Sequence, residues 1–202
     1  MIRILDYGLG NVKAFLNVFK LLNIKAAPAK KSADLEDCTH IIIPGVGAFD
    51  HAMNLINDSG MRGTLEDIVS GQSTPIMGVC VGMQILGDSS DEGNLKGLGW
   101  IPGKIKKISL NKKNLPLPHM GWNDIHDCEK CKLLDNILDP KYYFLHSYYF
   151  DANYDAHVEA SFDYGSRMPC VVRNNKVFGV QFHPEKSHEF GINLLKNFSL
   201  MT

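Results

Sequence analysis

The fold is decided by residues 75–84, which read PIMGVCVGMQ. The first half is an apolar run that starts at a proline, and it predicts a buried strand over Pro75–Val79 that passes directly into a helix over Val81–Leu86. Further upstream, His40–Ile43 is a continuous β-branched run closed by a Pro-Gly pair, as expected for a strand buried on both faces. Short buried strands that alternate with helices indicate an α/β fold with a parallel sheet.

The rest of the chain extends this pattern in both directions. On the N-terminal side we expect a strand at 2–6, a helix capped by Asn11, a strand at 24–29 and a helical stretch at 49–70 broken near Ser59-Gly60. On the C-terminal side we expect strands at 101–110, 142–150, 157–162, 170–173 and 177–182, a hairpin turn at Asn174-Asn175, and a helix at 187–200 capped by Ser187. The sequence therefore predicts one domain over residues 1–202. Its open, mostly parallel central sheet is flanked by helices, and the C-terminal half adds antiparallel strands.

The composition excludes several classes of protein. The 202 residues include 21 Lys and Arg against 22 Asp and Glu, so the formal net charge is −1, and a nucleic-acid binder would be more basic. Five cysteines are too few for a disulfide scaffold. The first residues reach a charge at Arg3, too early for a signal peptide, and the apolar stretch at 76–86 is too short to span a bilayer. We expect a cytoplasmic protein with no nucleic-acid or membrane partner.

Cys80 is the candidate nucleophile. A residue at a sharp strand-to-helix turn has a strained backbone, so the residues two before and two after it must be small, and here they are Gly78 and Gly82. This is the spacing of the nucleophile elbow of hydrolases, with Cys in place of Ser. The free N–H groups at the start of the following helix favour a thiolate and stabilise an oxyanion. The alternative is a buried structural cysteine.

His183 is the candidate general base. It follows a predicted strand and precedes a proline, so its backbone is extended and Glu185, two residues on, points the same way. A carboxylate bonded to one ring nitrogen fixes the tautomer and leaves the other nitrogen free to face a thiol. An ordinary surface turn is the alternative for this His-Pro-Glu sequence. A matching cysteine elsewhere in the chain favours a Cys-His-Glu triad.

Other motifs give weaker signals. The loop Pro44–Gly47 leaves its strand at the same edge of a parallel sheet as Cys80, so it is either a second oxyanion donor or a plain turn. Gly8-Leu9-Gly10 lacks the rest of a dinucleotide-binding motif. His126, Cys128 and Cys131 are metal-ligand types, but no second cluster completes a zinc site. The segment Pro118–Asn123 is interpreted as a glycine-broken loop that serves as a contact surface or a core plug. We therefore expect no metal and no cofactor.

Taken together, these residues resemble the class I, triad-type glutamine amidotransferases. The resemblance rests on residues 78–84 and 183–185, and it extends over residues 6–11, 44–49, 118–123, 143–148 and 179–187. Within that family the motifs are similar to those of the glutaminase subunits of histidine biosynthesis. The match runs from the first predicted strand to the last predicted helix.

The resemblance implies a role for each matching residue. Cys80 would attack the side-chain amide of glutamine to form a thioester and release ammonia, with His183 as acid and base and Glu185 as its orienter. The backbone N–H groups of Val46 and Val81 would bind the oxyanion. Glutamine itself would be held by Gly47, Gln84, His146, Ser147 and Tyr148. The ammonia would pass to a (β/α)8-barrel cyclase subunit in a heterodimer, which Asn11, Trp122 and Asn123 would face.

Three other readings stay open at this point. A paralogous glutaminase subunit would supply ammonia to a related synthase of surface-sugar biosynthesis, since the choice of recipient lies in the partner. A stand-alone thiol hydrolase would leave Trp122, Asn123 and Asn11 without a purpose. A non-catalytic binding subunit would have no reason to keep Cys80, His183 and Glu185 together.

Overall fold

A seven-stranded sheet forms the centre of the computed structural model, which describes residues 1–109 and 115–202. The strand order is β10-β11-β12-β4-β3-β1-β2. The bounds are β1 Ile2–Leu5, β2 Ala26–Ala29, β3 His40–Gly45, β4 Ile76–Cys80, β10 Val158–Tyr164, β11 Ser166–Asn174 and β12 Val177–Val180. Neighbours from β2 to β12 pair in parallel, whereas β11 and β10 join through antiparallel pairs. The expected mixed α/β sheet is confirmed.

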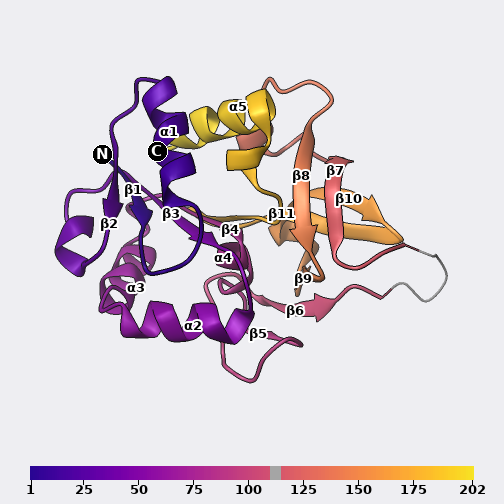
Figure 1. Cartoon of the computed structure of the whole chain (residues 1–202), viewed down its shortest axis with the longest axis horizontal. Coiled ribbons are helices and arrows are strands. Elements are labelled where there is room, and N and C mark those ends of the chain that lie inside the picture. The colour runs from indigo at the N-terminus through magenta and orange to yellow at the C-terminus, as the bar shows by residue number, and fades with distance from the viewer. Residues whose placement is uncertain (110–114) are drawn as a thin grey trace.

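Helices cover both faces of this sheet (Figure 1). One face carries α1 (Val12–Leu21) and α5 (His188–Ser199), which contact each other, and the other carries α2 (Phe49–Asp58) and α3 (Arg62–Gly71). The break expected near Ser59-Gly60 lies between α2 and α3. The β3 and β4 side chains are fully enclosed because both faces of these strands are covered, which agrees with their unbroken apolar sequence.

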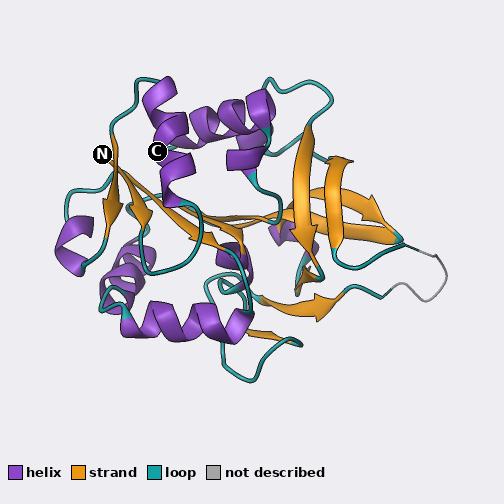
Figure 2. Cartoon of the chain, in the orientation of Figure 1, coloured by secondary structure: helices purple, strands orange, loops and turns teal. Residues whose placement is uncertain are grey.

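Two small sheets lie alongside the β10–β11 end of the central one (Figure 2). One joins β5 (Ser89–Ser90), β6 (Gly103–Lys107) and β9 (Tyr148–Ala152), and the other pairs β7 (His119–Asp124) with β8 (Lys141–His146). The expected single strand at 142–150 is therefore wrong. The chain changes partner at Ser147, since His146 pairs with His119 of β7 whereas Tyr148 pairs with Lys107 of β6.

Two further expectations need correction. The segment 118–123, expected as a loop, is largely strand β7, because Gly121 adopts a φ of 134° and still pairs with Phe144 of β8. The strand expected at 101–110 ends at Lys107, and Leu110 lies outside the described residues.

Of the two helix N-caps expected from the sequence, the structure shows a side-chain capping bond for Asn11 but not for Ser187. Asn11 caps α1 as expected, since its side-chain oxygen accepts a hydrogen bond from the Ala14 N–H at 3.1 Å. Ser187 stands at the cap position of α5, but its hydroxyl donates to the His183 carbonyl and accepts from the Tyr143 N–H instead. The helix expected at 81–86 is the short α4 (Val81–Gln84). Among the described residues, each helix is too short or too polar to cross a bilayer.

Candidate active site

Cys80 lies at the turn where β4 passes into α4. Its φ of 56° and ψ of −114° are unusual for a residue with a side chain and mark a strained backbone. A Cβ atom added at Gly78 would overlap the Gly82 carbonyl, and one added at Gly82 would overlap the carbonyl of Ile43 on β3. The requirement for small residues on both sides of the turn is therefore confirmed, and it comes from close backbone approach.

His183 reaches this turn because β12 lies directly beside β4. The two strands are parallel and in register, with Val180 opposite Val79, so the chain that leaves β12 emerges next to Cys80. Its position is fixed by backbone contacts, since the His183 N–H donates to the Tyr143 carbonyl at 2.9 Å and its carbonyl accepts from the Ser187 hydroxyl at 2.7 Å. These bonds hold the residue between strand β8 and helix α5.

Glu185 orients the imidazole of His183. The distance from Nδ1 to the carboxylate Oε1 is 2.8 Å, and the two side chains are only 2% and 3% exposed. A 3₁₀ turn over Pro184–Lys186 brings the carboxylate back to the ring. Within the described residues, the ring atom Nε2 and the other carboxylate oxygen of Glu185 have no hydrogen-bond partner, so Nε2 is available for a proton transfer.

The electrostatic balance around His183 favours its protonated form. Burial lowers the pKa of the imidazole, but the Cys80 sulfur and the Glu185 carboxylate together outweigh burial and raise the pKa of His183 to about 10. The raised pKa makes the neutral imidazole a strong base, so it holds firmly a proton that it takes from Cys80.

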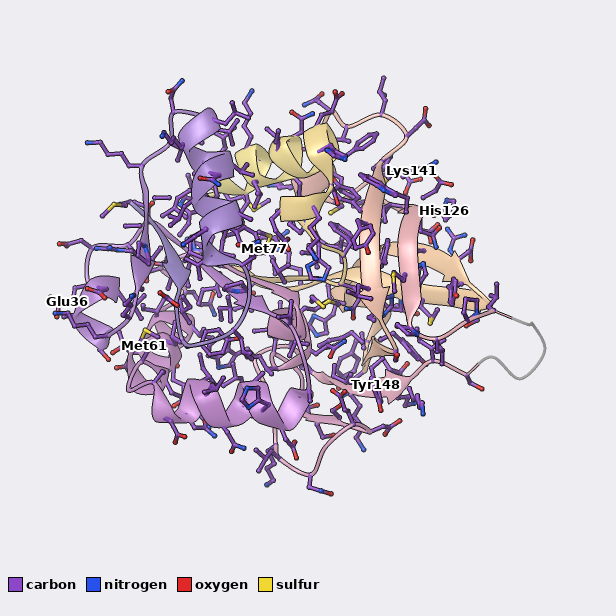
Figure 3. All side chains as sticks on the ribbon, viewed as in Figure 1. Glu36, Met61, Met77, His126, Lys141 and Tyr148 are labelled. Atoms are coloured by element: carbon purple, nitrogen blue, oxygen red, sulfur yellow. The ribbon has the colours of Figure 1, made fainter. Side chains whose placement is uncertain are left out.

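A cavity of about 240 Å³ opens in front of Cys80 and His183. Every residue that the sequence placed at the oxyanion or the glutamine subsite lines this cavity; these are Val46, Gly47, Val81, Gln84, His146, Ser147 and Tyr148. Figure 3 shows Tyr148 near the end of the β7–β8 pair opposite Lys141. Loops from β3, β4, β8 and β12 thus meet at one edge of the fold, as ligand sites of parallel sheets do.

Two of these side chains are already engaged inside the protein. Gln84 donates from Nε2 to the Tyr148 carbonyl at 3.2 Å and to Oε1 of Gln181 at 3.1 Å. The ring nitrogens of His146 bond the Tyr148 carbonyl at 2.8 Å and His119 at 3.0 Å. Both side chains therefore help to shape the wall of the cavity.

The sequence did not point to three residues that line the cavity or to one that contacts Cys80. Glu92, Pro118 and Leu145 complete the lining. Gln181, which is fully buried, donates from Nε2 to the Cys80 sulfur at 3.9 Å. Glu92 comes from the irregular segment after β5 and carries no motif, whereas Gln181 lies two residues before His183 and its position could have drawn attention.

The residues expected at a partner surface lie outside the cavity. Trp122 is 43% exposed on β7 and stacks on His188, and Met120 on the same strand is 62% exposed. Asn123 donates to the Asp163 carbonyl at 2.9 Å and to Nε2 of His119 at 3.3 Å. Asn11 is exposed at the start of α1.

The cysteines near residue 130 do not assemble a metal site in the described part of the chain, which has no group of three or more His, Cys, Asp or Glu arranged to hold an ion. Burial raises the pKa of the Cys128 and Cys131 thiols, an effect opposite to what a metal-binding thiolate needs.

Residues 3–201 match the family described as glutamine amidotransferase class I. The chain belongs to this family. It is 49% identical over 206 residues to the imidazole glycerol phosphate synthase subunit HisH of Bdellovibrio bacteriovorus, covering 98% of this chain and 99% of the relative. The subunit of the same name from Leptospira interrogans is 50% identical over 202 residues, with the same coverage. A crystal structure of a glutamine amidotransferase superposes with a TM-score of 0.77 at 20% identity, covering 98% of this chain and 99% of that one, and shows the same fold. The chain is thus a glutamine amidotransferase.

Proposed function

We propose that this glutamine amidotransferase is the glutaminase subunit of an imidazole glycerol phosphate synthase in histidine biosynthesis. The observation that carries the proposal is the arrangement of Cys80, His183 and Glu185, with a strained nucleophile turn and a buried imidazole whose free nitrogen has no partner in the described chain. Relatives of about half-identical sequence over nearly the whole chain carry that subunit's name, and they support the choice of pathway.

The reaction starts at the Cys80 sulfur. The S–H bond breaks as the proton moves to Nε2 of His183, and the sulfur attacks the side-chain carbonyl carbon of glutamine. The imidazolium then returns the proton to the amide nitrogen, the C–N bond breaks and ammonia leaves. A water molecule then gives a proton to the same imidazole and attacks the thioester carbonyl; the C–S bond breaks, the imidazolium returns the proton to the Cys80 sulfur, and glutamate is released. Glu185 keeps Nδ1 protonated and stabilises the imidazolium in both halves.

The negative charge on the substrate oxygen needs donors on the opposite side from His183. We assign this role to the N–H groups of Val46 and Val81, both of which line the cavity. Val81 is the first residue of α4, so the positive end of the helix faces the developing charge. Backbone donors held in this way contribute about 10²–10³ each to turnover.

The α-amino and α-carboxylate groups of glutamine require polar partners at the far end of the cavity. Gly47, Gln84 and the segment His146–Tyr148 line the cavity, and we propose that they hold these groups. Glu92 adds a carboxylate suited to an ammonium group. Its Oε2 accepts the Phe49 N–H at 2.8 Å, which fixes the carboxylate at the start of α2.

The ammonia is proposed to pass to a (β/α)8-barrel cyclase subunit that makes imidazole glycerol phosphate and the aminoimidazole carboxamide ribonucleotide. The exposed Met120 and Trp122 on β7 suit the apolar core of such a contact, and Asn11 and Asn123 are proposed as its polar partners. We also place the heterodimer in the cytoplasm, where the five unpaired cysteines would stay reduced.

Genetic complementation tests the pathway. The chain, expressed together with the cyclase subunit of its own source, should restore growth without histidine to a bacterium that lacks its glutaminase subunit, and Cys80→Ala should not. If the wild-type pair fails but purified chain and barrel release glutamate from glutamine, the ammonia serves another synthase, such as one of surface-sugar biosynthesis. Failure of both assays would exclude the glutaminase.

A further inference from the structure

A continuous series of hydrogen bonds, which runs between side chains except at the backbone carbonyl of Tyr148, joins the outer strand β7 to Cys80. At its outer end, Asn123 donates to Nε2 of His119 at 3.3 Å, and Nδ1 of His119 lies 3.0 Å from Nε2 of His146. We call His119 and His146 the histidine pair. His119 is 3% and His146 is 6% exposed, although β7 itself lies at the surface. The pair thus carries polar contacts through an apolar layer.

The inner end of the series reaches the sulfur. Nδ1 of His146 bonds the Tyr148 carbonyl, which also accepts from Nε2 of Gln84. The second hydrogen of that Gln84 nitrogen goes to Oε1 of Gln181 at 3.1 Å, and Nε2 of Gln181 donates to the Cys80 sulfur at 3.9 Å. Each of the two Gln84 hydrogens therefore has its own acceptor.

The direction of every bond follows from its neighbours. Because a carbonyl oxygen only accepts, His146 must carry its hydrogen on Nδ1, so its Nε2 accepts from Nδ1–H of His119. The remaining nitrogen of His119 then accepts from Asn123. At the other end, Gln84 donates to Oε1 of Gln181, and this leaves the Gln181 N–H₂ group, not its oxygen, on the sulfur.

These donor and acceptor directions require both rings of the histidine pair to be neutral, and their surroundings favour the neutral form. His119 stacks on Tyr164 at 4.0 Å and on Phe162 at 5.4 Å between ring centroids. Burial lowers the pKa of His119 to about 4, and burial together with the neighbouring His119 and His183 lowers the pKa of His146 to about 3, against the opposing bond to Tyr148. At neutral pH both rings therefore keep the lone pairs that the bond order requires.

We propose that the Gln181 amide N–H stabilises the negative charge on the Cys80 sulfur, and that the histidine pair, through Tyr148 and Gln84, fixes the direction of this donor. In this structure the thiol donates to the Leu145 carbonyl at 3.9 Å, and this bond is lost when the proton moves to His183. The N–H of Gln181 stays intact and remains on the sulfur. Gln181 is then a catalytic residue, whereas Gln84 and the histidine pair are positioning residues. The inference rests on the thiol chemistry proposed above.

Alkylation of Cys80 by iodoacetamide tests the donor without glutamine. Mass spectrometry of the tryptic peptide 63–96, which contains no other cysteine, reports the rate at this residue in the full chain. Gln181→Met keeps the length of the side chain and removes the donor. We expect its alkylation rate at pH 7 to fall about tenfold, the effect of losing one hydrogen bond to a charged group, while the rates at pH 10 become equal. An unchanged rate at pH 7 would overturn the proposal, and equal losses at both pH values would indicate a purely structural role.

A double-mutant cycle tests the histidine pair. His119→Phe preserves the aromatic stack and breaks the series, so alkylation at pH 7 should slow at least about twofold in the wild-type background and not at all in the Gln181→Met background. The matched control is His40→Phe, since His40 is also buried and bonds a carbonyl, that of Met201, at the opposite end of β3. Equal slowing by His119→Phe in both backgrounds would refute the link. Because the readout needs no substrate, it stays informative if the chain proves to have no glutaminase activity.

Discussion

The substitution Glu185→Gln separates the orienting role of this carboxylate from its charge. The amide oxygen of glutamine can still accept from Nδ1 of His183, now at 2.8 Å from Oε1, so the tautomer and the ring position should persist. The new N–H₂ group falls where Oε2 has no partner among the described residues, and one buried unsatisfied donor costs about 1–3 kcal/mol of stability. What the variant loses for catalysis is the negative charge beside the imidazolium.

The expected loss of turnover can be estimated from substitutions in other catalytic triads. Loss of the charged orienter in a Ser-His-Asp triad lowers kcat by about 10⁴, whereas loss of the nucleophile lowers it by about 10⁶. We therefore expect Glu185→Gln to retain about a hundredfold more glutamine turnover than Cys80→Ala. The pH profile should change as well. Because Glu185 contributes to the raised His183 pKa of about 10, the alkaline limb of kcat/KM should move to lower pH in the variant.

The assay is steady-state release of glutamate by the complex with its barrel between pH 6 and 11. Glu189→Gln is the matched control, since Glu189 is exposed in the first turn of α5 and should behave as wild type. Thermal melts add a second readout. A histidine whose pKa is raised on folding stabilises the protein below pH 6.5 and loses that contribution as the pH rises towards 10. The decrease in melting temperature between pH 6.5 and 10 should therefore be smaller in Glu185→Gln than in the wild type. A variant as inactive as Cys80→Ala, with glutamine binding unchanged, would refute the orienter role.

Three further predictions concern the nucleophile, the turn and the partner. Cys80→Ala should abolish glutamine hydrolysis while the complex still uses added ammonia, and loss of both reactions would indicate a damaged interface. Gly82→Ala should lower the free energy of unfolding, measured by urea titration, by at least about 2–3 kcal/mol, because the added Cβ would overlap the Ile43 carbonyl. The control Gly63→Ala on α3 places its Cβ in open space and should cause no such loss of stability. The isolated chain should hydrolyse glutamine at least about a hundredfold more slowly than the complex, and Trp122→Ala should weaken the partner's stimulation; equal rates with and without partner would contradict gating.

The sequence predicted the central sheet and the triad because short-range chemistry dictates both. The apolar runs at β3 and β4 have to be buried on both faces, and the glycines around Cys80 reflect contacts between backbone atoms. The His183–Glu185 pair was readable because the two residues are only two positions apart, although a 3₁₀ turn and not the expected extended chain brings the carboxylate to the ring. Local rules were sufficient for these features.

The C-terminal strands were harder to predict because their partners are distant in sequence. Residues 142–150 form one continuous apolar and aromatic run, and nothing local marks Ser147 as the position where pairing changes from β7 to β6. Strand β7 was hidden by Gly121, whose positive φ is compatible with pairing in this sheet. Glu92 and Gln181 were missed for the same reason, since each acquires its role only when loops from separate strands meet.

The contacts of the loop after β3 limit where gating can act. The Tyr7 hydroxyl donates to the Pro44 carbonyl at 2.7 Å, and a Cβ at Gly45 would come within 2.6 Å of the Gly82 nitrogen, so these two positions are held against the segment after β1 and the turn at Cys80. Val46, by contrast, is 43% exposed, and Gly47 has a φ of 108° with open space around its Cβ position. The assigned donor, the Val46 N–H, belongs to the peptide between Gly45 and Val46, so a partner that alters it has to rotate that peptide. The exposed Val46 and the open position at Gly47 leave room for this rotation. Gly47→Ala, which penalises the positive φ without a steric clash, should consequently lower the stimulated rate more than the basal one.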